Sequence, residues 1–541
     1  MEKSGEQQYL SNQMKIGSVE RRTANYMPNI WNYSLLQSLT NKYEEEKYRR
    51  QEETLKREIS CIFHEVKDPV AKLELIDCIS KLALSHYFEK DIYETLNTMV
   101  NTNKFGSCME DNLYLTVLYF RILRQYDVFL NFTDDVGQFK ISEHLDDKPI
   151  LQLLEAFYLG VESESLLETA QVFATENLSA NSEISSLPCP LHLSVRWFNV
   201  KKHVNVQEKE NKTNSMLLQL GRLHFNMAQA QQQKDLKEIL RWWRNLDLKD
   251  TLIFTRDRVV ESFLWAVGVA FEPEHGSLRK WLTKVIMFIL IIDDVYDIYG
   301  SWEELECFTS AVNRWNHTEI HQLPEALRKC FCALYDTTID MDQQIQQEKY
   351  WNSVLPYLIK GWKDFCQALN VEAKWYHTGY TPRLGEYLEN GWISSSGPLL
   401  SLVVLFGVGQ DIAETINILE NNQEIIYYSS LIVRLCNDQG TSTAELERGD
   451  APSSILCYMR EANVPEEEAR EHIRNIISNL WKKINGLCIN GSPKLLQTLL
   501  YIINIARVAH FIYQNGDGFS VQDGETRHQV LSCLLEPLPL N

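Results

Sequence analysis

The sequence predicts an all-α protein built from two helical domains. The first observation is that apolar residues recur at spacings of three and four in nearly every segment, and residues 149–178 illustrate this with acidic residues between them. The second is that Asn, Gly and Pro separate these segments at longer intervals than the short, regular ones of an all-β fold. The sequence also has no Asn-Gly or Asp-Gly turn flanked by alternating strand patterns, and no strand–helix–strand rhythm.

Composition limits the classes of partner. The chain has 541 residues and a formal net charge of -20, which argues against nucleic acid because an acidic surface repels phosphate backbones. An anionic substrate must therefore be held by a local basic patch or by metal ions. The 12 cysteines include no Cys-x-x-Cys pair, which is typical of reduced core residues in an intracellular protein.

The N-terminal tail, to about Pro28, is polar and without pattern, so we expect a strap lying across another surface. Its first 20 residues contain three Glu and no Arg, unlike a transit peptide. We expect a cytoplasmic location, with the plastid as the alternative. The apolar run Val285–Ile292 is eight residues long and too short to cross a bilayer, so we expect no membrane span. We also expect a monomer.

A break in the pattern marks the domain boundary. Residues 206–215 are polar and charged, and the clustered chemical motifs all follow them. We place the boundary near residue 212. Residues 1–212 then form an N-terminal helical domain with its strap, and residues 213–541 form the catalytic domain.

The strongest motif is an Asp-Asp-x-x-Asp run formed by Asp293, Asp294 and Asp297. It ends a predicted helix that is apolar on all sides and therefore buried. At about 100° per residue, Asp293 and Asp297 lie roughly 40° apart and Asp294 within roughly 100°, so we expect one shared face. Crowded carboxylates repel one another unless a hard cation such as Mg²⁺ joins them. The other interpretation is an N-cap or a surface acid cluster.

A second motif consists of Asn437, Thr441 and Glu445, which recur every four residues along a helix stripe about 12 Å long. An amide oxygen, a hydroxyl and a carboxylate suit a further Mg²⁺, although the stripe alone could be a solvated face. The two motifs could face each other across a helical bundle. Three Mg²⁺ ions between them would suit a diphosphate, and Mn²⁺ is a possible substitute.

This pairing of motifs resembles plant class I terpene synthases, and the resemblance covers nearly the whole chain. It implies a C-terminal class I terpenoid synthase α-bundle and an N-terminal helical (α-barrel) domain. It also implies a diphosphate-releasing lyase that ionises a prenyl diphosphate to an allylic carbocation. The N-terminal half contains no Asp-x-Asp-Asp motif, which argues against protonation-initiated class II chemistry.

The resemblance also assigns roles to individual residues. Arg256, Arg258 and Arg434 would hold the departing diphosphate, for which bidentate guanidinium groups are suited, although a lone Arg is more often a surface ion pair. Aromatic faces can stabilise a carbocation, and the implied cation pocket consists of Trp265, Tyr513, Asp517 and Phe519. Residues 394–398 resemble the family's helix break. Independently of the resemblance, Gly397-Pro398 would interrupt a helix.

The N-terminal residues Arg21, Arg22 and Trp31 resemble the tandem-arginine motif of the angiosperm monoterpene-synthase subfamily, in which the strap closes over the active site. The strap, residues 449–463 and the C-terminal end look most like the members that make acyclic products, the α-farnesene and β-ocimene synthases. Ser453 stands where many relatives carry Lys, so one diphosphate contact is missing. Gln439 replaces an apolar residue and points off the metal stripe, so we expect it to matter little.

The first-choice product is (E,E)-α-farnesene from farnesyl diphosphate, with (E)-β-ocimene from geranyl diphosphate close behind. Linalool, nerolidol or a cyclic monoterpene are the alternatives. A chain-elongating prenyl diphosphate synthase should carry two aspartate-rich motifs, whereas the second motif here is Asn, Thr and Glu. A non-enzymatic helical scaffold would have no reason to pair these motifs, and a degenerate synthase would be expected to lack metal-binding positions.

Overall fold

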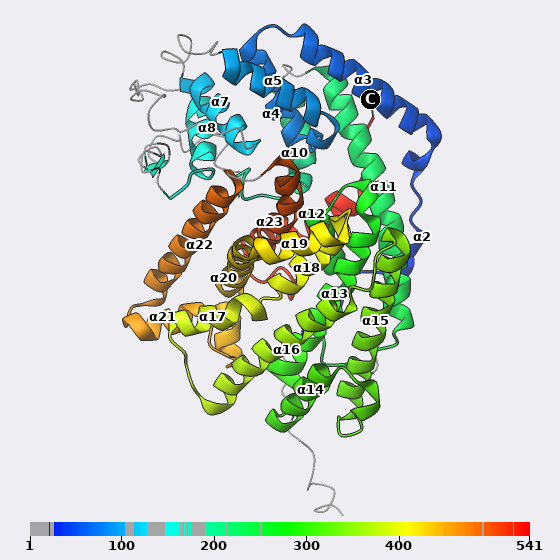
Figure 1. The fold of residues 1–541 in the computed structure, drawn as a ribbon, viewed down its shortest axis with the longest axis vertical. Coiled ribbons are helices and arrows are strands. Elements are labelled where there is room, and N and C mark those ends of the chain that lie inside the picture. The colour runs from blue at the N-terminus through cyan, green and yellow to red at the C-terminus, as the bar shows by residue number, and fades with distance from the viewer. Residues whose placement is uncertain are drawn as a thin grey trace, which may run out of the picture.

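Helices and turns account for all regular structure in the described part of the chain, which confirms the all-α prediction. The computed structural model describes residues 21, 26–102, 113–126, 147–162, 164, 167–168, 171–172, 174, 190–210, 214–248, 251–449, 451–489, 492–522 and 524–540. Figure 1 shows the N-terminal helices gathered at one end of the molecule and the later helices forming a larger bundle at the other.

The N-terminal region is a set of amphipathic helices that bury their apolar stripes against one another. Its described helices are α2 (Tyr33–Ser38), α3 (Glu46–Glu65), α4 (Pro69–Lys81), α5 (Glu89–Thr102), α7 (Leu113–Gln125), α8 (Asp147–Phe157) and α10 (Arg196–Glu210). The stretch 149–178, chosen above for its helical spacing, begins with α8, which ends at Phe157 before a turn at Gly160, and residues 167–168, 171–172 and 174 are again helical.

The long helix α11 (Ser215–Asn245) joins the two regions. It packs against α3 and α10 of the N-terminal region and against α12 (Val259–Val269) and α13 (Gly276–Asp294) of the bundle. Residues 206–210, expected to lie in the polar break, are instead the last residues of α10, and α11 begins at Ser215. One hydrophobic core therefore runs through both regions. The boundary near residue 212 stays a prediction.

The remaining helices form the bundle around the site. They are α14 (Trp302–Arg314), α15 (Glu325–Lys349), α16 (Leu355–Thr378), α17 (Leu384–Ser394), α18 (Gly397–Val408), α19 (Ile412–Asn421), α20 (Gln423–Arg448), α21 (Ser454–Ala462), α22 (Glu466–Ile489), α23 (Pro493–Tyr513) and α24 (Gly524–Val530). Helix α20 packs against α17, α18, α22 and α23 and so lies near the centre of this bundle.

Two local breaks shape the site. The predicted break is confirmed, because α17 ends at Ser394 and α18 begins at Gly397, with Ser396 between them at φ +65°. A left-handed Ser and a Pro in the first helical turn both prevent α17 from continuing as one helix. The second break is a π-helical segment, Val295–Tyr299, which directly follows α13 and carries Asp297.

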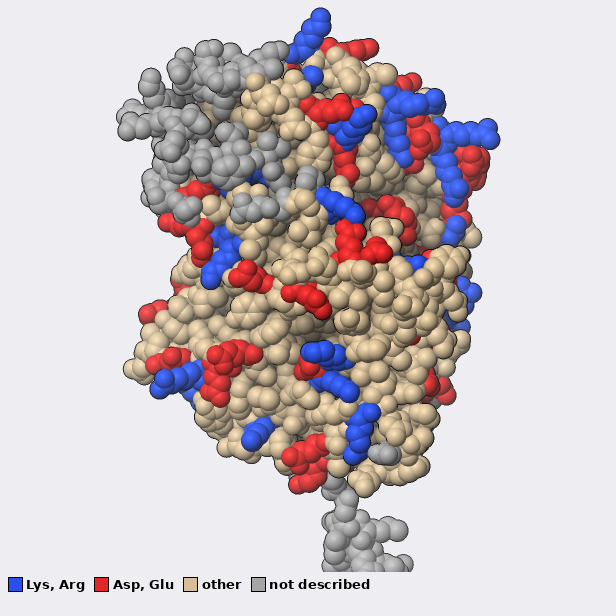
Figure 2. Space-filling view, viewed as in Figure 1, with Lys and Arg blue, Asp and Glu red and all other residues tan. Residues whose placement is uncertain are grey.

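Two apolar stretches, Leu384–Val408 and Lys494–Tyr513, are long and apolar enough to cross a membrane by length and composition. Within their most apolar windows, 67% and 56% of the residues are buried in the protein. Both stretches contribute pocket-lining residues described below, and buried bundle helices meet the same length criterion. Figure 2 shows basic and acidic side chains interspersed over the visible face, without a continuous basic stripe of the kind that binds nucleic acid.

Candidate active site

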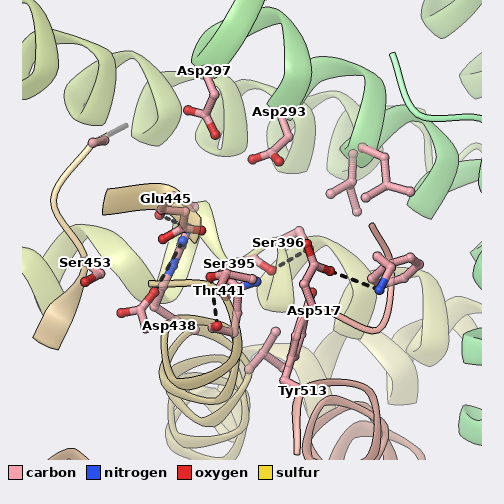
Figure 3. Close-up of a pocket in the computed structure, with 18 of the residues that line it drawn as sticks. Asp293, Asp297, Ser395, Ser396, Asp438, Thr441, Glu445, Ser453, Tyr513 and Asp517 are labelled. Carbon is pink, nitrogen blue, oxygen red and sulfur yellow. Dashed lines mark hydrogen bonds and ion pairs between the residues drawn. The ribbon is translucent and has the colours of Figure 1, made fainter. Parts of the chain in front are cut away.

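One pocket in the bundle collects most of the predicted functional residues. The residues that line it come from α13 and its π-helical extension, α16, the break between α17 and α18, α20, the turn before α21, and the end of α23. In Figure 3, Asp293 and Asp297 project from one helix toward the side on which Thr441 and Glu445 lie. The two motifs, which are far apart in sequence, therefore form opposite walls of one pocket.

The first wall differs from the prediction that three carboxylates share one face. Asp293 and Asp297 line the pocket, whereas Asp294 is 1% exposed and lies behind them. Asp294 accepts hydrogen bonds from the backbone N–H of Arg256 at 2.9 Å and from its Nε at 3.3 Å. The physical reason is that one helical step of about 100° turns Asp294 off the wall. Burial raises the pKa of the Asp294 carboxyl to about 6, and Arg256 opposes that rise.

The second wall is the predicted stripe on α20. Asn437, Thr441 and Glu445 all line the pocket, and the Thr441 hydroxyl donates to the Asn437 carbonyl at 2.9 Å. Ser453 also lines the pocket and caps the N-terminus of α21. Its short hydroxyl therefore lies at the position where a Lys would place a positive charge.

Two of the three predicted arginines face the pocket. Arg256 donates to Asp293 at 2.7 Å and also pairs with Asp294. Burial alone would lower the pKa of Arg256, but Asp294 and the other acidic groups raise it well above its usual value. Arg434 lines the pocket and donates to the Ser394 hydroxyl at 2.9 Å. Both guanidinium groups therefore remain charged beside the acidic walls.

Arg258 has a different environment from the one expected for a diphosphate contact. It is 1% exposed and does not belong to the pocket lining. Its guanidinium donates to the backbone carbonyls of Phe519 and Met27 at 2.8 Å and of Ser520 at 3.1 Å. In this arrangement Arg258 joins the strap to the loop after α23, because its donors are used by backbone carbonyls.

The four predicted residues of the cation pocket lie together at the pocket wall. The Trp265 and Phe519 rings stack with centroids 5.3 Å apart, and Tyr513 meets Trp265 edge-on at 6.3 Å. Asp517 accepts from the backbone N–H groups of Phe519 at 3.0 Å and Ser520 at 2.9 Å, which shapes the loop that presents Phe519. The stacked rings offer aromatic faces of the kind that stabilise a cation.

The strap residues of the tandem-arginine motif are anchored on both sides of the pocket. Arg21 donates to the Tyr299 carbonyl at 2.8 Å and forms an ion pair with Glu304. Trp31 Nε1 donates to the buried Glu261 carboxylate at 2.6 Å. Arg22 lies outside the described residues. The strap is therefore joined both to the element that follows Asp297 and to α12.

Sequence reasoning missed several pocket residues, of which Tyr26 is the most informative. Tyr26 lines the pocket from the strap, and the Arg256 guanidinium lies 4.8 Å from its ring centroid. Its side chain is also one of the groups that lower the pKa of the Asp294 carboxyl. The only sequence signal was its place between the tandem arginines and Trp31. The other missed lining residues, Glu372, Tyr387 and Asp438, form buried contacts between α16, α17 and α20 that carry no local signature.

Replacing Tyr26 by alanine is expected to open the strap end of the pocket and admit water. With the carbocation chemistry that the sequence resemblance implies, the fraction of product released as an alcohol should rise, because water competes with proton loss for the cation. Gas chromatography of the products measures this ratio. Tyr26→Phe keeps the ring and is the matched control, so it should retain most of the hydrocarbon product. An unchanged alcohol fraction in Tyr26→Ala would contradict this role.

The donor set of the two walls fits hard divalent cations. Carboxylate, amide and hydroxyl oxygens are the ligands that Mg²⁺ accepts, and Mg²⁺ usually takes only one or two carboxylates plus water and substrate phosphate. Within the described ranges, no group of three or more His, Cys, Asp or Glu could hold an ion by itself. The walls therefore suit ions whose remaining ligands come from water and a diphosphate.

Comparison with known proteins agrees with the fold and the site. Residues 30–196 match the family described as "Terpene synthase, N-terminal domain", and residues 244–483 match "Terpene synthase family, metal binding domain". An α-farnesene synthase from Ricinus communis is 48% identical, with 96% of each chain covered. An (E,E)-α-farnesene synthase from Malus domestica is 46% identical, with 99% of each chain covered.

Solved structures show the same architecture. A limonene synthase structure with 2-fluorolinalyl diphosphate superimposes with a TM-score of 0.89 at 35% identity, covering 96% of this chain and 100% of that one. Isoprene synthase from grey poplar, in complex with three Mg²⁺ ions and dimethylallyl-S-thiolodiphosphate, gives a TM-score of 0.85 at 37% identity, covering 95% and 100%.

The all-helical fold and the acidic pocket thus define a metal-binding enzyme that ionises a prenyl diphosphate and releases the diphosphate as a lyase. The chain belongs to the terpene synthase family, as a plant class I member. This confirms the all-α fold predicted from helical periodicity and the family predicted from the resemblance of the motifs. The roles of the individual site residues stay predictions, for which the geometry above is the support.

Proposed function

We propose that the chain converts farnesyl diphosphate to (E,E)-α-farnesene with Mg²⁺ as the metal. The observation that carries the proposal is a single pocket with two oxygen-rich walls and an aromatic wall, in a chain 46–48% identical to two α-farnesene synthases. Three Mg²⁺ ions are proposed because an isoprene synthase binds that number with a diphosphate analogue, and Mn²⁺ is the proposed substitute.

Different groups of pocket residues have different roles in this proposed reaction. When bound, Mg²⁺ withdraws charge from the diphosphate and lowers the barrier to C–O cleavage. Arg256 and Arg434 carry permanent charges at the pocket and hold the departing diphosphate by bidentate hydrogen bonds. The stacked Trp265 and Phe519 rings then face the allylic cation, and the apolar wall around them keeps water away from it. Loss of a proton completes the hydrocarbon.

The second candidate is (E)-β-ocimene from geranyl diphosphate, in place of or beside farnesene. The anchored strap favours this alternative, because its tandem-arginine motif resembles the monoterpene-synthase subfamily. Linalool or nerolidol would result from water capture, and a cyclic monoterpene from further reaction of the cation, an outcome supported by the similarity in fold to a limonene synthase. A cytoplasmic location and a monomeric state remain proposals.

Product analysis separates these candidates. Purified protein is given Mg²⁺ and either farnesyl or geranyl diphosphate, and the volatiles are identified by gas chromatography. We expect α-farnesene from the C15 substrate, with a higher kcat/KM than for the C10 substrate. Omission of Mg²⁺ in the presence of chelator is the control and should abolish product. Ocimene, linalool or a cyclic product mainly from C10 would overturn the farnesene proposal, and no volatile from either would overturn both.

A further inference from the structure

The face of α20 that points away from the metal-binding stripe is held by one arginine of α22. Arg470 Nη1 donates to the Gln439 backbone carbonyl at 2.9 Å and contacts its side-chain oxygen at 3.3 Å. Arg470 Nη2 donates to the Ser442 hydroxyl at 2.8 Å and lies 3.1 Å from the Thr443 hydroxyl. In return, Gln439 Nε2 donates to the Arg470 carbonyl at 2.9 Å. The contact is therefore reciprocal.

These contacts bracket the stripe in sequence. Gln439 lies between Asn437 and Thr441, and Ser442 and Thr443 lie between Thr441 and Glu445. The end of α23 and the loop after it approach α20 from a second side, because a Cβ at Gly440 would meet the backbone oxygens of Tyr513 and Gly516 at 3.0 Å. Helix α20 is thus held on two sides along the segment that carries the predicted ligands.

This support matters because of where the stripe ends. Glu445 lies three residues before the end of α20 at Arg448, in the last turn, where helix ends fray and where the Gly449 N–H caps the Glu445 and Leu446 carbonyls. Ligands of a small, strongly directional ion such as Mg²⁺ must be held to within about 0.5 Å of their working positions. Arg470 is well suited to this, because its side chain is 16% exposed and its planar fork donates to several acceptors at once.

We propose that Arg470 and Gln439 form a positioning pair. The pair fixes the place of Thr441 and Glu445 on α20 relative to the opposite wall, which carries Asp293 and Asp297. The proposal rests on the proposed Mg²⁺-dependent function of that wall. Neither residue lies in the pocket that binds the substrate, so both act through Thr441 and Glu445. Gln439 does point off the metal stripe, as expected from the sequence, but its contacts with Arg470 give it a role that the sequence did not indicate.

The test uses Arg470→Ala in the full chain, with Mg²⁺ and inorganic diphosphate as the binding probe. The readout is the rise in melting temperature with increasing Mg²⁺ at saturating diphosphate, which needs no turnover. We expect the Mg²⁺ concentration for half of the full rise to increase about 10-fold, the size seen when groups that orient metal ligands are removed. Activity should fall at low Mg²⁺ and recover substantially at high Mg²⁺.

The matched control is Arg474→Ala, one turn further along α22. Arg474 is 47% exposed and pairs with Glu467 and Glu471 of its own helix, so its loss should leave the Mg²⁺ dependence unchanged. Gln439→Leu removes only the side-chain half of the pair and should give a smaller shift. The double variant should match Arg470→Ala alone, because coupled residues are not additive.

Two outcomes separate the proposal from the function on which it rests. An Mg²⁺ dependence of Arg470→Ala equal to that of Arg474→Ala, in an active protein, would overturn the positioning pair alone. A wild-type protein that forms no terpene and is not stabilised by Mg²⁺ with diphosphate would instead overturn the proposed function. If Arg470→Ala does not fold, Arg470→Lys replaces it, because lysine keeps the positive charge but lacks the planar guanidinium group. We expect this variant to give an intermediate increase in the Mg²⁺ concentration for half of the full rise in melting temperature.

Discussion

Asp293→Ala is expected to reduce terpene formation by at least about 100-fold, because it removes a proposed ligand of the Mg²⁺ ions that would stabilise the charge developing on the diphosphate. Asp293 lines the pocket from the end of α13, and its side chain is 36% exposed. Helical content should be unchanged, since no core contact is lost. Steady-state kinetics with Mg²⁺ and far-ultraviolet circular dichroism measure the two effects.

Asp294 provides the comparison that makes this test specific. Its side chain is 1% exposed and pairs with Arg256, so Asp294→Ala should reduce both activity and the free energy of unfolding. A stable, helical Asp293→Ala protein with near-normal turnover would contradict the assignment of this wall to metal binding. Equal losses of stability in the two variants would contradict the different positions that the structure gives them.

Arg256→Ala should have the second largest effect, on both activity and stability. It removes a permanent charge that faces the diphosphate end of the pocket, so we expect kcat/KM to fall at least about 100-fold. It also leaves Asp294 buried without its partner, which costs about 3 kcal/mol of the free energy of unfolding. Kinetics with farnesyl diphosphate and urea unfolding measure these losses.

A double variant separates the two roles of Arg256. Asp294→Asn removes the buried charge that Arg256→Ala leaves unpaired, so the combination should regain most of the stability without regaining activity. If the double variant stayed as unstable as Arg256→Ala, the pairing with Asp294 would not explain the loss. If Arg256→Ala kept a normal kcat/KM, the arginine would not contact the diphosphate.

The fold class and the two metal motifs were predictable because their signals are local. Helical periodicity in each segment indicated an all-α protein, and the four-residue spacing of Asn437, Thr441 and Glu445 placed these residues on one face of α20. The break at residues 394–398 was also predictable, since Pro398 cannot continue a helix hydrogen-bond ladder. The resemblance to known enzymes then brought the two motifs together.

The contacts between helices could not be predicted in the same way. Asp294 and Arg258 belong to motifs, yet the first is turned toward Arg256 and the second toward backbone carbonyls of the strap and the α23 loop. Tyr26 contacts Arg256 in the pocket although the two residues are about 230 positions apart in the sequence. Over that separation, residue spacing gives no geometric information.

By itself, the sequence determined the helical fold and the family and predicted the residues expected to bind metal, because period, spacing and residue type act within one helix. Only the tertiary structure decided which of those side chains face the pocket and which support it. Arg470 illustrates the reason, since its hydrogen bonds to Gln439 and Ser442 depend on how α22 packs against α20. Because this packing is set by the whole bundle, the sequence of α22 does not indicate which residues Arg470 contacts.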